Sequence, residues 1–432
     1  MGNKNNEKPV DPNMDLNAYA NKYINEDDDN NTHDNPIQLL NIESPYYEVE
    51  QLSTNINKVL NRETSFTYTS MHLNIQSLPA KFDKLKLLIS ELHDQQIDLD
   101  FILLCETFLT DNIASQFNIE GFNLVYKNRL TMARGGVAIY VNTKFSFKVR
   151  DDLATNVPGV FESVFIEIKS QKYNAIVGEI YRVPNTNEVN SIKMYESICK
   201  NLHGYNHNII IGTDQNFDYI KIDQHRNTEE LLSTFLAHGL VPTITKPTRI
   251  AHSTATLIDN LYISVKNKIN LKSAILCVDI SDHLPILLCI GATKREKIKK
   301  PLILRKRLLT DTAMHNIANS IKHINWDYLD SLPLNEAYTD FSNKLNSIIE
   351  SAAPEKVINI PSSQVKRDPW VTHGLLISSR TLNKLHRKRL GKLKSDPQYE
   401  KYIHFRNLYN KLRRTAKQNY YKDLFEKYQY NI

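Results

Sequence analysis

Residues 208–216 read NIIIGTDQN, an apolar run that ends in a carboxylate, Asp214, and an amide, Asn216, two residues apart. A short apolar run bounded by polar turn residues is typical of a buried β-strand. The carboxylate could orient or deprotonate water, and the amide could donate a hydrogen bond to a phosphate oxygen. An Asx-turn would explain the same two residues without any chemistry.

Three further polar residues stand at the ends of apolar runs. Glu106 directly follows FILLC at 101–105, Asp259 precedes NLYI at 260–263, and His283 precedes LPILLCI at 284–290. The Glu106 carboxylate would suit Mg²⁺ or Mn²⁺, although an acid in this position can also cap a helix. Asp259 could accept an N–H from the His283 imidazole and fix its tautomer. Several acids and one imidazole at strand ends indicate a metal-assisted hydrolase.

The region from residue 67 to residue 290 alternates short β-branched or aromatic runs with longer amphipathic ones, which is typical of a mixed α/β domain. The strand candidates are Thr67–Leu73, Phe101–Cys105, Leu124–Lys127, Val137–Val141, Phe161–Ile168, Tyr173–Ile180, Asn208–Gly212, Asn260–Ile263, Lys272–Cys277 and Ile286–Ile290. The amphipathic pattern predicts helices at Lys81–His93, Glu188–Leu202 and Glu229–His238. So many strands favour two packed sheets over one open sheet.

Charge is unevenly distributed along the 432 residues, whose formal net charge is +6. Residues 1–50 carry about −8 and residues 293–432 about +15. A basic tail attracts phosphates and releases counterions, so nucleic acid is the first partner to consider, with DNA as the substrate and RNA as a further ligand of the tail. A solvated helical surface would have the same composition.

Two flanking regions surround the α/β domain. Residues 1–65 are acidic and rich in Asn, which predicts disorder. Residues 293–432 begin with a basic connector at 294–300 and are mainly helical, with helices expected at 310–324, 335–351, 370–394 and 398–430 and a loop at 354–369. The last helix carries an aromatic and apolar stripe, which is either a packing surface or a stacking platform for bases.

The cysteines and the N-terminus bear on the cellular compartment. The 4 cysteines are isolated within apolar runs, which favours buried thiols in a reducing compartment. The N-terminus lacks the apolar core of a signal peptide, and no run reaches the ~18 apolar residues of a membrane span. We therefore expect a soluble, intracellular and nuclear protein that does not bind membranes.

The order of six short motifs carries a family resemblance. They are LNIQSL at 73–78, LCET at 104–107, IYRVP at 180–184, GTDQN at 212–216, TLIDN at 256–260 and SDH at 281–283. Over residues 66–292 they resemble the endonuclease/exonuclease/phosphatase family. The resemblance implies a DNase I-like fold, which is a four-layer α/β sandwich with two packed β-sheets flanked by helices.

The resemblance also implies roles for individual residues. Asn74 would belong to the metal or phosphate site, Tyr181 would lie near the scissile phosphate, and Asp282 would support the metal or the histidine. The chain departs from the family at Thr213, where many members have Gly before the Asp, and at Gln76, where many have an acid. A site with one metal, centred on Glu106, is the expectation that fits these departures.

Within the family, several motifs look like the non-LTR (LINE-type) retrotransposon branch. They include RGGVAIY at 134–140 and DPWVT at 368–372, the second being similar to the segment that joins endonuclease to reverse transcriptase. The sequence contains no [Phe/Tyr]-x-Asp-Asp polymerase motif.

These observations predict a Mg²⁺-dependent DNA endonuclease, with Mn²⁺ as a possible substitute. Glu106, Asn74 and Asp282 would form the metal site, while the catalytic residues would be Asp214, His283, Asp259, Asn216 and Tyr181. The alternatives are a phosphatase of the same fold and an inactive or domesticated nucleic-acid-binding fragment.

Overall fold

The computed structural model describes residues 42–52, 54, 66–129, 134–169, 174–203, 205, 208–264, 271–291, 302–360 and 368–428. The chain forms two units, one of Met1–Ile298 with His373–Asn410 and one of Lys299–Thr372 with Lys411–Ile432. Most of the segment predicted to be disordered, and the basic connector at 294–300, lie outside the described residues.

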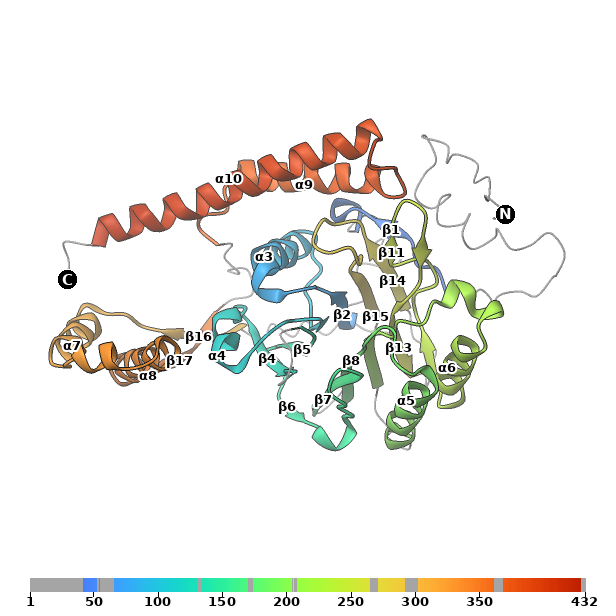
Figure 1. Ribbon diagram of the computed structural model, residues 1–432, viewed down its shortest axis with the longest axis horizontal. Coiled ribbons are helices and arrows are strands. Elements are labelled where there is room, and N and C mark those ends of the chain that lie inside the picture. Colours follow the sequence, from blue (N-terminus) through green and yellow to red (C-terminus); the bar gives the residue numbers. More distant parts are fainter. Residues whose placement is uncertain are drawn as a thin grey trace. The chain divides into compact units, whose positions relative to one another are not determined.

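The first unit contains two large mixed sheets (Figure 1). In spatial order, the seven strands of the first sheet are β1 (Tyr46–Tyr47), β14 (Leu271–Leu276), β15 (Ile286–Gly291), β2 (Phe66–Asn74), β3 (Phe101–Cys105), β5 (Val137–Asn142) and β4 (Phe122–Lys127). The six strands of the second are β10 (Leu240–Pro242), β13 (Asp259–Ser264), β9 (Asn208–Asp214), β8 (Ala175–Arg182), β7 (Phe161–Ile168) and β6 (Phe147–Val149). A short ribbon pairs β11 (Arg249–Ile250) with β12 (Ala255–Thr256).

Strand β3 shows how the core is built, because it is buried on both faces. Phe101, Leu103 and Cys105 belong to the core that lies between the sheets, whereas Ile102 and Leu104 belong to a second core on the other face. Successive side chains of a strand point to opposite faces, so a strand covered on both sides needs a continuous apolar run. This is why residues 101–105 read FILLC.

Helices cover the outer face of each sheet (Figure 1). Helix α3 (Leu78–Asp94) adds Leu85, Leu88 and Leu92 to the core on the outer side of the first sheet. Helices α5 (Glu188–Leu202) and α6 (Arg226–Ala237) cover the second sheet, where the rings of Phe235 and Tyr262 stack 3.9 Å apart. The short helix α4 (Asp111–Ala114) follows β3. The predicted four-layer α/β sandwich is therefore confirmed.

Every strand predicted from the sequence is present, and the bounds of β3 and β7 match the prediction. The sequence missed β1, β6 and β10, which have two or three residues each and lie at the edges of the two sheets. Strands this short carry no readable alternation of apolar and polar residues.

Residues 42–52 differ from the expectation of disorder. Strand β1 pairs in parallel with β14, and Tyr46, Val49 and Leu52 are buried. The Tyr46 hydroxyl donates a hydrogen bond to the carbonyl of Pro247 at 2.8 Å. Three apolar side chains at regular spacing give this segment a surface to bury, although the sequence around them is polar.

The second unit combines a strand pair with helices. Helices α7 (Asp311–Lys322) and α8 (Leu334–Ala352) confirm two of the predicted helices. Strand β16 (Leu302–Arg307) pairs antiparallel with β17 (Glu355–Ile360), so the predicted loop at 354–369 is wrong over residues 355–360. Val357, Ile358 and Ile360 suit a strand, but the partner strand is distant in the sequence and a local reading does not show it.

Two further helices complete the described chain. They are α9 (His373–Arg389) and α10 (Pro397–Tyr428). Helix α9 and the start of α10, which the sequence assigned to the C-terminal extension, belong to the first unit. Arg387 and Arg380 of α9 pair with Glu48 and Glu50 at 3.4 and 3.5 Å. None of the helices in the described ranges combines the length and apolar character that crossing a membrane requires.

Glu91 on α3 offers a test of this packing. The side chain is 4% exposed, and burial, with a smaller effect of the Glu50 charge, raises the pKa of Glu91 to about 7 against the opposing effect of Arg380. A raised carboxyl pKa in the folded state means that stability is lost as the pH rises from about 4.5 through 7. We predict that Glu91→Gln is more stable than the wild type at pH 8, by on the order of 2 kcal/mol, and equally stable at pH 4.

Urea denaturation of both proteins at the two pH values measures this difference. Glu196→Gln on α5, where the Glu196 side chain is 44% exposed and pairs with Lys200, is the control and should show no gain at pH 8. A Glu91→Gln protein that is no more stable than the wild type at pH 8 would contradict the prediction.

Candidate active site

Strand direction brings the predicted site residues to one edge of the sandwich. Strand β2 is parallel to β3, and β8 is parallel to β9, so the carboxyl ends of each pair lie side by side. Strand β13 is antiparallel to β9 and β15 is antiparallel to β2, so their first residues lie at the same edge. The residues at this edge are Asn74, Glu106, Tyr181, Asp214, Asp259 and His283.

The carboxamide of Asn74 holds two carboxylates. Its Nδ2 donates hydrogen bonds of 2.8 Å to Glu106 Oε1 and of 2.8 Å to Asp214 Oδ2. The Tyr181 hydroxyl donates to the same Glu106 oxygen at 3.0 Å. Asn74 and Glu106 extend from the first sheet, whereas Asp214 and Tyr181 extend from the second. These hydrogen bonds therefore join the two sheets at the site.

His283 and Asp259 form a buried pair beside this group. The Nδ1 atom of His283 lies 3.0 Å from Asp259 Oδ1 and 2.9 Å from Oδ2. Thr248 Oγ1 donates to Asp259 Oδ2 at 2.5 Å. The predicted role of Asp259, to hold the imidazole of His283 by one nitrogen, agrees with this geometry.

Burial and neighbouring charges shift the pKa values of these groups. Burial and the Asp259 charge raise the pKa of Asp214 to about 7, while His283 and the Asn74 hydrogen bond oppose this rise. Burial alone would lower the pKa of His283, but the charge and hydrogen bond of Asp259 outweigh it and raise the pKa to about 9. Burial would raise the pKa of Asp259, but His283 and then His72 hold it below its usual range. The pair is thus an imidazolium and a carboxylate at neutral pH.

Asn216 and Tyr181 complete the group of residues predicted to contact a phosphate. Asn216 Nδ2 donates to the carbonyl of Arg182 at 2.7 Å, and Arg182 Nη1 donates to the carbonyl of Asn216 at 3.1 Å. Burial, and then the charges of Glu106 and Asp214, raise the pKa of Tyr181. Tyr181 is therefore a neutral hydroxyl that can donate a hydrogen bond.

Asp282 does not join the carboxylates that Asn74 holds. It pairs with Arg249, whose Nη2 lies 2.6 Å from Asp282 Oδ2, and its side chain is 41% exposed. Glu106 and Asp214 are better placed to share a cation, since one amide nitrogen bonds to both. Their donors are carboxylate oxygens, which Mg²⁺ and Mn²⁺ prefer. As a metal ligand, Asp282 stays a prediction.

The backbone is strained around this edge. Gln76, Glu106 and Asn216 have φ values of 46°, 50° and 51°, which place them in the left-handed region that side-chain-bearing residues rarely adopt. Such residues persist only where the surrounding structure holds them, and they cluster at functional sites. Hydrogen bonds hold them here, including those from the Gln76 N–H to Asn74 Oδ1 at 3.2 Å and from Asn216 Nδ2 to the Arg182 carbonyl at 2.7 Å.

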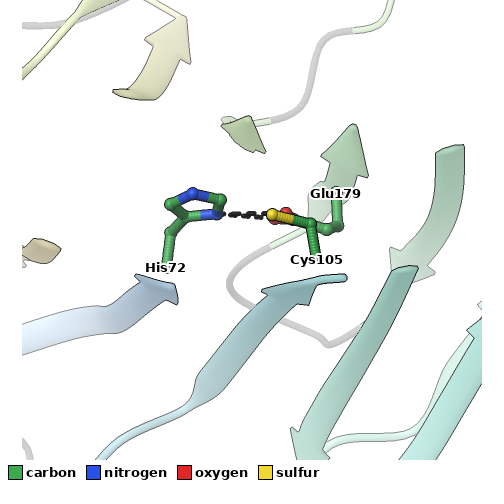
Figure 2. A group of neighbouring side chains, drawn as sticks. All are labelled: His72, Cys105 and Glu179. Atoms are coloured by element: carbon green, nitrogen blue, oxygen red, sulfur yellow. Dashed lines mark hydrogen bonds and ion pairs between the residues drawn. The ribbon is translucent and has the colours of Figure 1, made fainter. Parts of the chain in front are cut away.

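A second layer of polar side chains extends from β2, β3 and β8 of the two sheets (Figure 2). His72, Cys105 and Glu179 are fully buried, and their ligand-type atoms lie within 4.8 Å of one another. His72 Nδ1 lies 3.0 Å from Glu179 Oε1 and 3.1 Å from Oε2, and its Nε2 lies 3.5 Å from Asp259 Oδ1. Burial raises the pKa of the Cys105 thiol well above its ordinary value, which disfavours the thiolate.

Gly212 makes room for this second layer. A Cβ atom at this position would lie 2.4 Å from Glu179 Oε2 and 3.0 Å from His72 Nδ1. Thr213, which departs from the family pattern, lies in strand β9 and needs no special φ. Because Asn216 makes the left-handed turn instead, Thr213 does not disturb the turn.

The loop that leads to His283 is anchored at Asp279. Lys84 of α3 donates to Asp279 Oδ2 at 2.9 Å, and Tyr402 of α10 donates to Oδ1 at 2.6 Å. His386 of α9 lies 3.5 Å from Oδ1, and Asn383 Oδ1 accepts the Asp279 N–H at 3.1 Å. Helices far along the chain therefore hold the loop of the SDH motif.

The structure thus brings together Asn74, Glu106, Tyr181, Asp214, Asp259 and His283, and places Asn216 next to them. Sequence reasoning missed His72, Glu179 and Thr248. The spacing in the sequence could have identified the first two, because His72 stands two residues before Asn74 and Glu179 stands two residues before Tyr181. Residues two apart on a strand share a face, so both point toward the same interior.

Comparisons with known proteins found similar solved structures. No family model matches the chain, and no curated protein matches it. The endonuclease domain of TRAS1, a telomere-specific non-LTR retrotransposon, is 14% identical with a TM-score of 0.39, and the match covers 52% of this chain and 98% of that one. A mannosyl-6-phosphatase of Bacteroides thetaiotaomicron has the same identity and TM-score, and the match covers 52% of this chain and 99% of that one.

Truncated TDP2 of Caenorhabditis elegans is also 14% identical, with a TM-score of 0.38 over 52% of this chain and 98% of that one. Other matched structures are named as endonuclease/exonuclease/phosphatase family proteins, the family that the motifs resemble. At such identities and TM-scores these likenesses do not select an activity. The geometry of the site must do so.

We predict that Asn74→Asp destabilises the metal-free protein. The change removes the N–H groups that join Glu106 and Asp214 and adds a third carboxylate between them. We expect a loss of about 3 kcal/mol at pH 7 in EDTA, measured by chemical denaturation. Combining Asn74→Asp with Glu106→Gln removes one charge and should recover most of the loss. Equal stability of Asn74→Asp and the wild type would contradict the inference that the Asn74 N–H groups hold Glu106 and Asp214 together.

Proposed function

We propose that this protein is a Mg²⁺-dependent endonuclease that nicks DNA by hydrolysis of a phosphodiester bond. The observation that supports it best is the Asn74 amide nitrogen shared by Glu106 and Asp214, next to the Asp259–His283 pair. Phosphodiester hydrolysis needs carboxylates that bind a cation and a group that orients or deprotonates water. It also needs a charged donor, here an imidazole, that contacts the phosphate.

Glu106 and Asp214, with Asn74, are the residues that would hold the metal. Their oxygen donors and partly exposed Glu106 fit a hard divalent cation. Bound Mg²⁺ would neutralise charge on the phosphate and lower the pKa of a water. Asp282 is a further candidate for the metal site, from its place in the SDH motif.

The other residues act on the substrate directly. Asp259 holds Nδ1 of His283, so the imidazolium would offer its Nε2–H to the phosphate. Asn216 would add a neutral donor to the phosphate oxygens as negative charge develops, and Tyr181 would do so by turning its single O–H from Glu106 to the phosphate. Asp214, whose Oδ2 accepts a hydrogen bond from the same Asn74 amide nitrogen as Glu106, would orient or deprotonate the attacking water.

A polymeric substrate agrees with the charge of the chain. Residues 293–432 carry about +15, and the last turn of α9 contains the basic side chains Arg387, Lys388 and Arg389. Such charge binds a nucleic-acid backbone without sequence preference, and more weakly at high salt. With the retrotransposon-like motifs, this favours target-site nicking of nuclear DNA, and leaves RNA as a further ligand of the tail.

Nicking of supercoiled plasmid tests the proposal. We expect the full chain to convert supercoiled to open-circular DNA in Mg²⁺ and not in EDTA. His283→Ala should lower kcat by about 100-fold or more, because the phosphate loses its charged donor. Glu106→Gln should raise the Mg²⁺ concentration needed for half-maximal rate. His93→Ala and Glu196→Gln, at surface positions on α3 and α5, are the matched controls and should nick at the wild-type rate.

Four outcomes would count against the proposal. Nicking that persists in EDTA would exclude the metal-dependent reaction, and wild-type rates for His283→Ala would exclude the site. Faster release of phosphate from soluble inositol phosphates than nicking of plasmid would indicate a phosphatase. Binding of DNA in a mobility-shift assay without any cleavage would indicate a nucleic-acid-binding fragment.

A further inference from the structure

His72 and Glu179 extend the Asp259–His283 pair into the space between the two sheets. Figure 2 shows His72 facing Cys105 and Glu179 across that space. The His72 ring contacts Glu179 through Nδ1 and Asp259 through Nε2. All three side chains are almost completely buried, with Asp259 1% exposed and the other two 0%. The contacts run in one line, from Glu179 through His72 and Asp259 to His283.

The contacts give two buried acids a hydrogen-bonding partner. Glu179 and Asp259 are buried carboxylates, and a buried charge without a partner costs several kcal/mol. Both nitrogens of the His72 ring face a carboxyl oxygen, Nδ1 that of Glu179 and Nε2 that of Asp259. His72 therefore contacts Glu179 on one side and shares Asp259 with His283 on the other.

The line also limits where Asp259 can lie. Thr248 holds Asp259 Oδ2, and His72 approaches Oδ1, so both oxygens have a partner besides His283. Glu179 in turn fixes the rotation of the His72 ring. The absence of a side chain at Gly212 leaves the space that Glu179 and His72 occupy. Residues from β2, β8, β9 and β13 thus combine to orient one carboxylate.

We propose that His72, held by Glu179, is a positioning residue for the Asp259–His283 pair. This rests on the proposed function, in which His283 contacts the substrate phosphate. His72 does not itself reach the substrate. It acts by keeping the Asp259 carboxylate in the orientation that directs the His283 ring.

Steady-state nicking by Glu179→Gln and His72→Gln in the full chain tests the proposal. Glu179→Gln changes one atom and keeps the side-chain volume, so it is the variant least prone to misfolding. We expect kcat to fall by about tenfold to 100-fold for each variant, the range typical of residues that orient a catalytic group. The KM for plasmid should stay the same, because the residues that contact DNA remain.

Double variants separate positioning from a general loss of stability. His72→Gln in a His283→Ala background should lower kcat no further, because the residue through which His72 acts is gone. In a Glu106→Gln background the two losses should multiply. Ser273→Ala, which removes a buried hydroxyl from β14 away from the site, controls for the loss of a buried polar group and should keep the wild-type kcat.

A measurement without substrate tests the geometry alone. In protein with ¹⁵N-labelled histidine, ring N–H protons that bond to carboxylates give signals at unusually low field. We expect Glu179→Gln to move the His72 signal, and His72→Gln to remove it and shift that of His283. If the wild type does not nick DNA, the proposed function fails, while these spectra still decide whether His72 positions His283.

Several results would overturn the proposal. One is an unchanged kcat in Glu179→Gln and His72→Gln at unchanged or reduced stability, and another is a His283 signal that does not respond to His72→Gln. Losses that multiply in the His283→Ala background would also overturn it. So would stoichiometric zinc bound by His72, Cys105 and Glu179 in the purified protein, because the metal would replace the proton on Nδ1.

Discussion

The hydrogen bonds from one amide nitrogen of Asn74 to Glu106 and Asp214 are the interaction on which the site depends. The two carboxylates come from different sheets, and without a shared donor they would repel each other in a buried place. The same bonds close the edge of the sandwich where β2, β3 and β9 end. A cation bound beside Glu106 and Asp214 would reduce the same repulsion between the two carboxylates that the Asn74 amide reduces.

Acidic side chains and histidine rings alternate along a line of contacts at this edge. Glu179, His72, Asp259 and His283 follow one another in contact, each acid beside a ring that can carry a proton. Such a buried polar network is stable only if every member has its partner. Gly212 leaves the space that His72 and Glu179 occupy, and Thr248 adds a partner for Asp259.

Strand ends were readable from the sequence because buried strands leave continuous apolar runs, and because Glu106, Asp214 and His283 directly follow or precede such runs. The second layer was not readable, since the contact of His72 with Glu179 requires knowing which faces of two sheets meet. The anchoring of Asp279 by Tyr402 depends on a chain segment more than a hundred residues later. Asp282 shows that a motif can also predict too much. Its place in the SDH motif predicts a metal ligand, but its side chain pairs with Arg249.

The most direct test of the site is the position of a bound divalent cation in crystals of the full chain. Anomalous scattering from Mn²⁺ locates the ion without any assumption about activity. We predict one strong peak within coordination distance of carboxylate oxygens of Glu106 and Asp214. A peak at His72, Cys105 and Glu179 instead, or no peak near Glu106 at saturating Mn²⁺, would contradict a site built around the Asn74 amide.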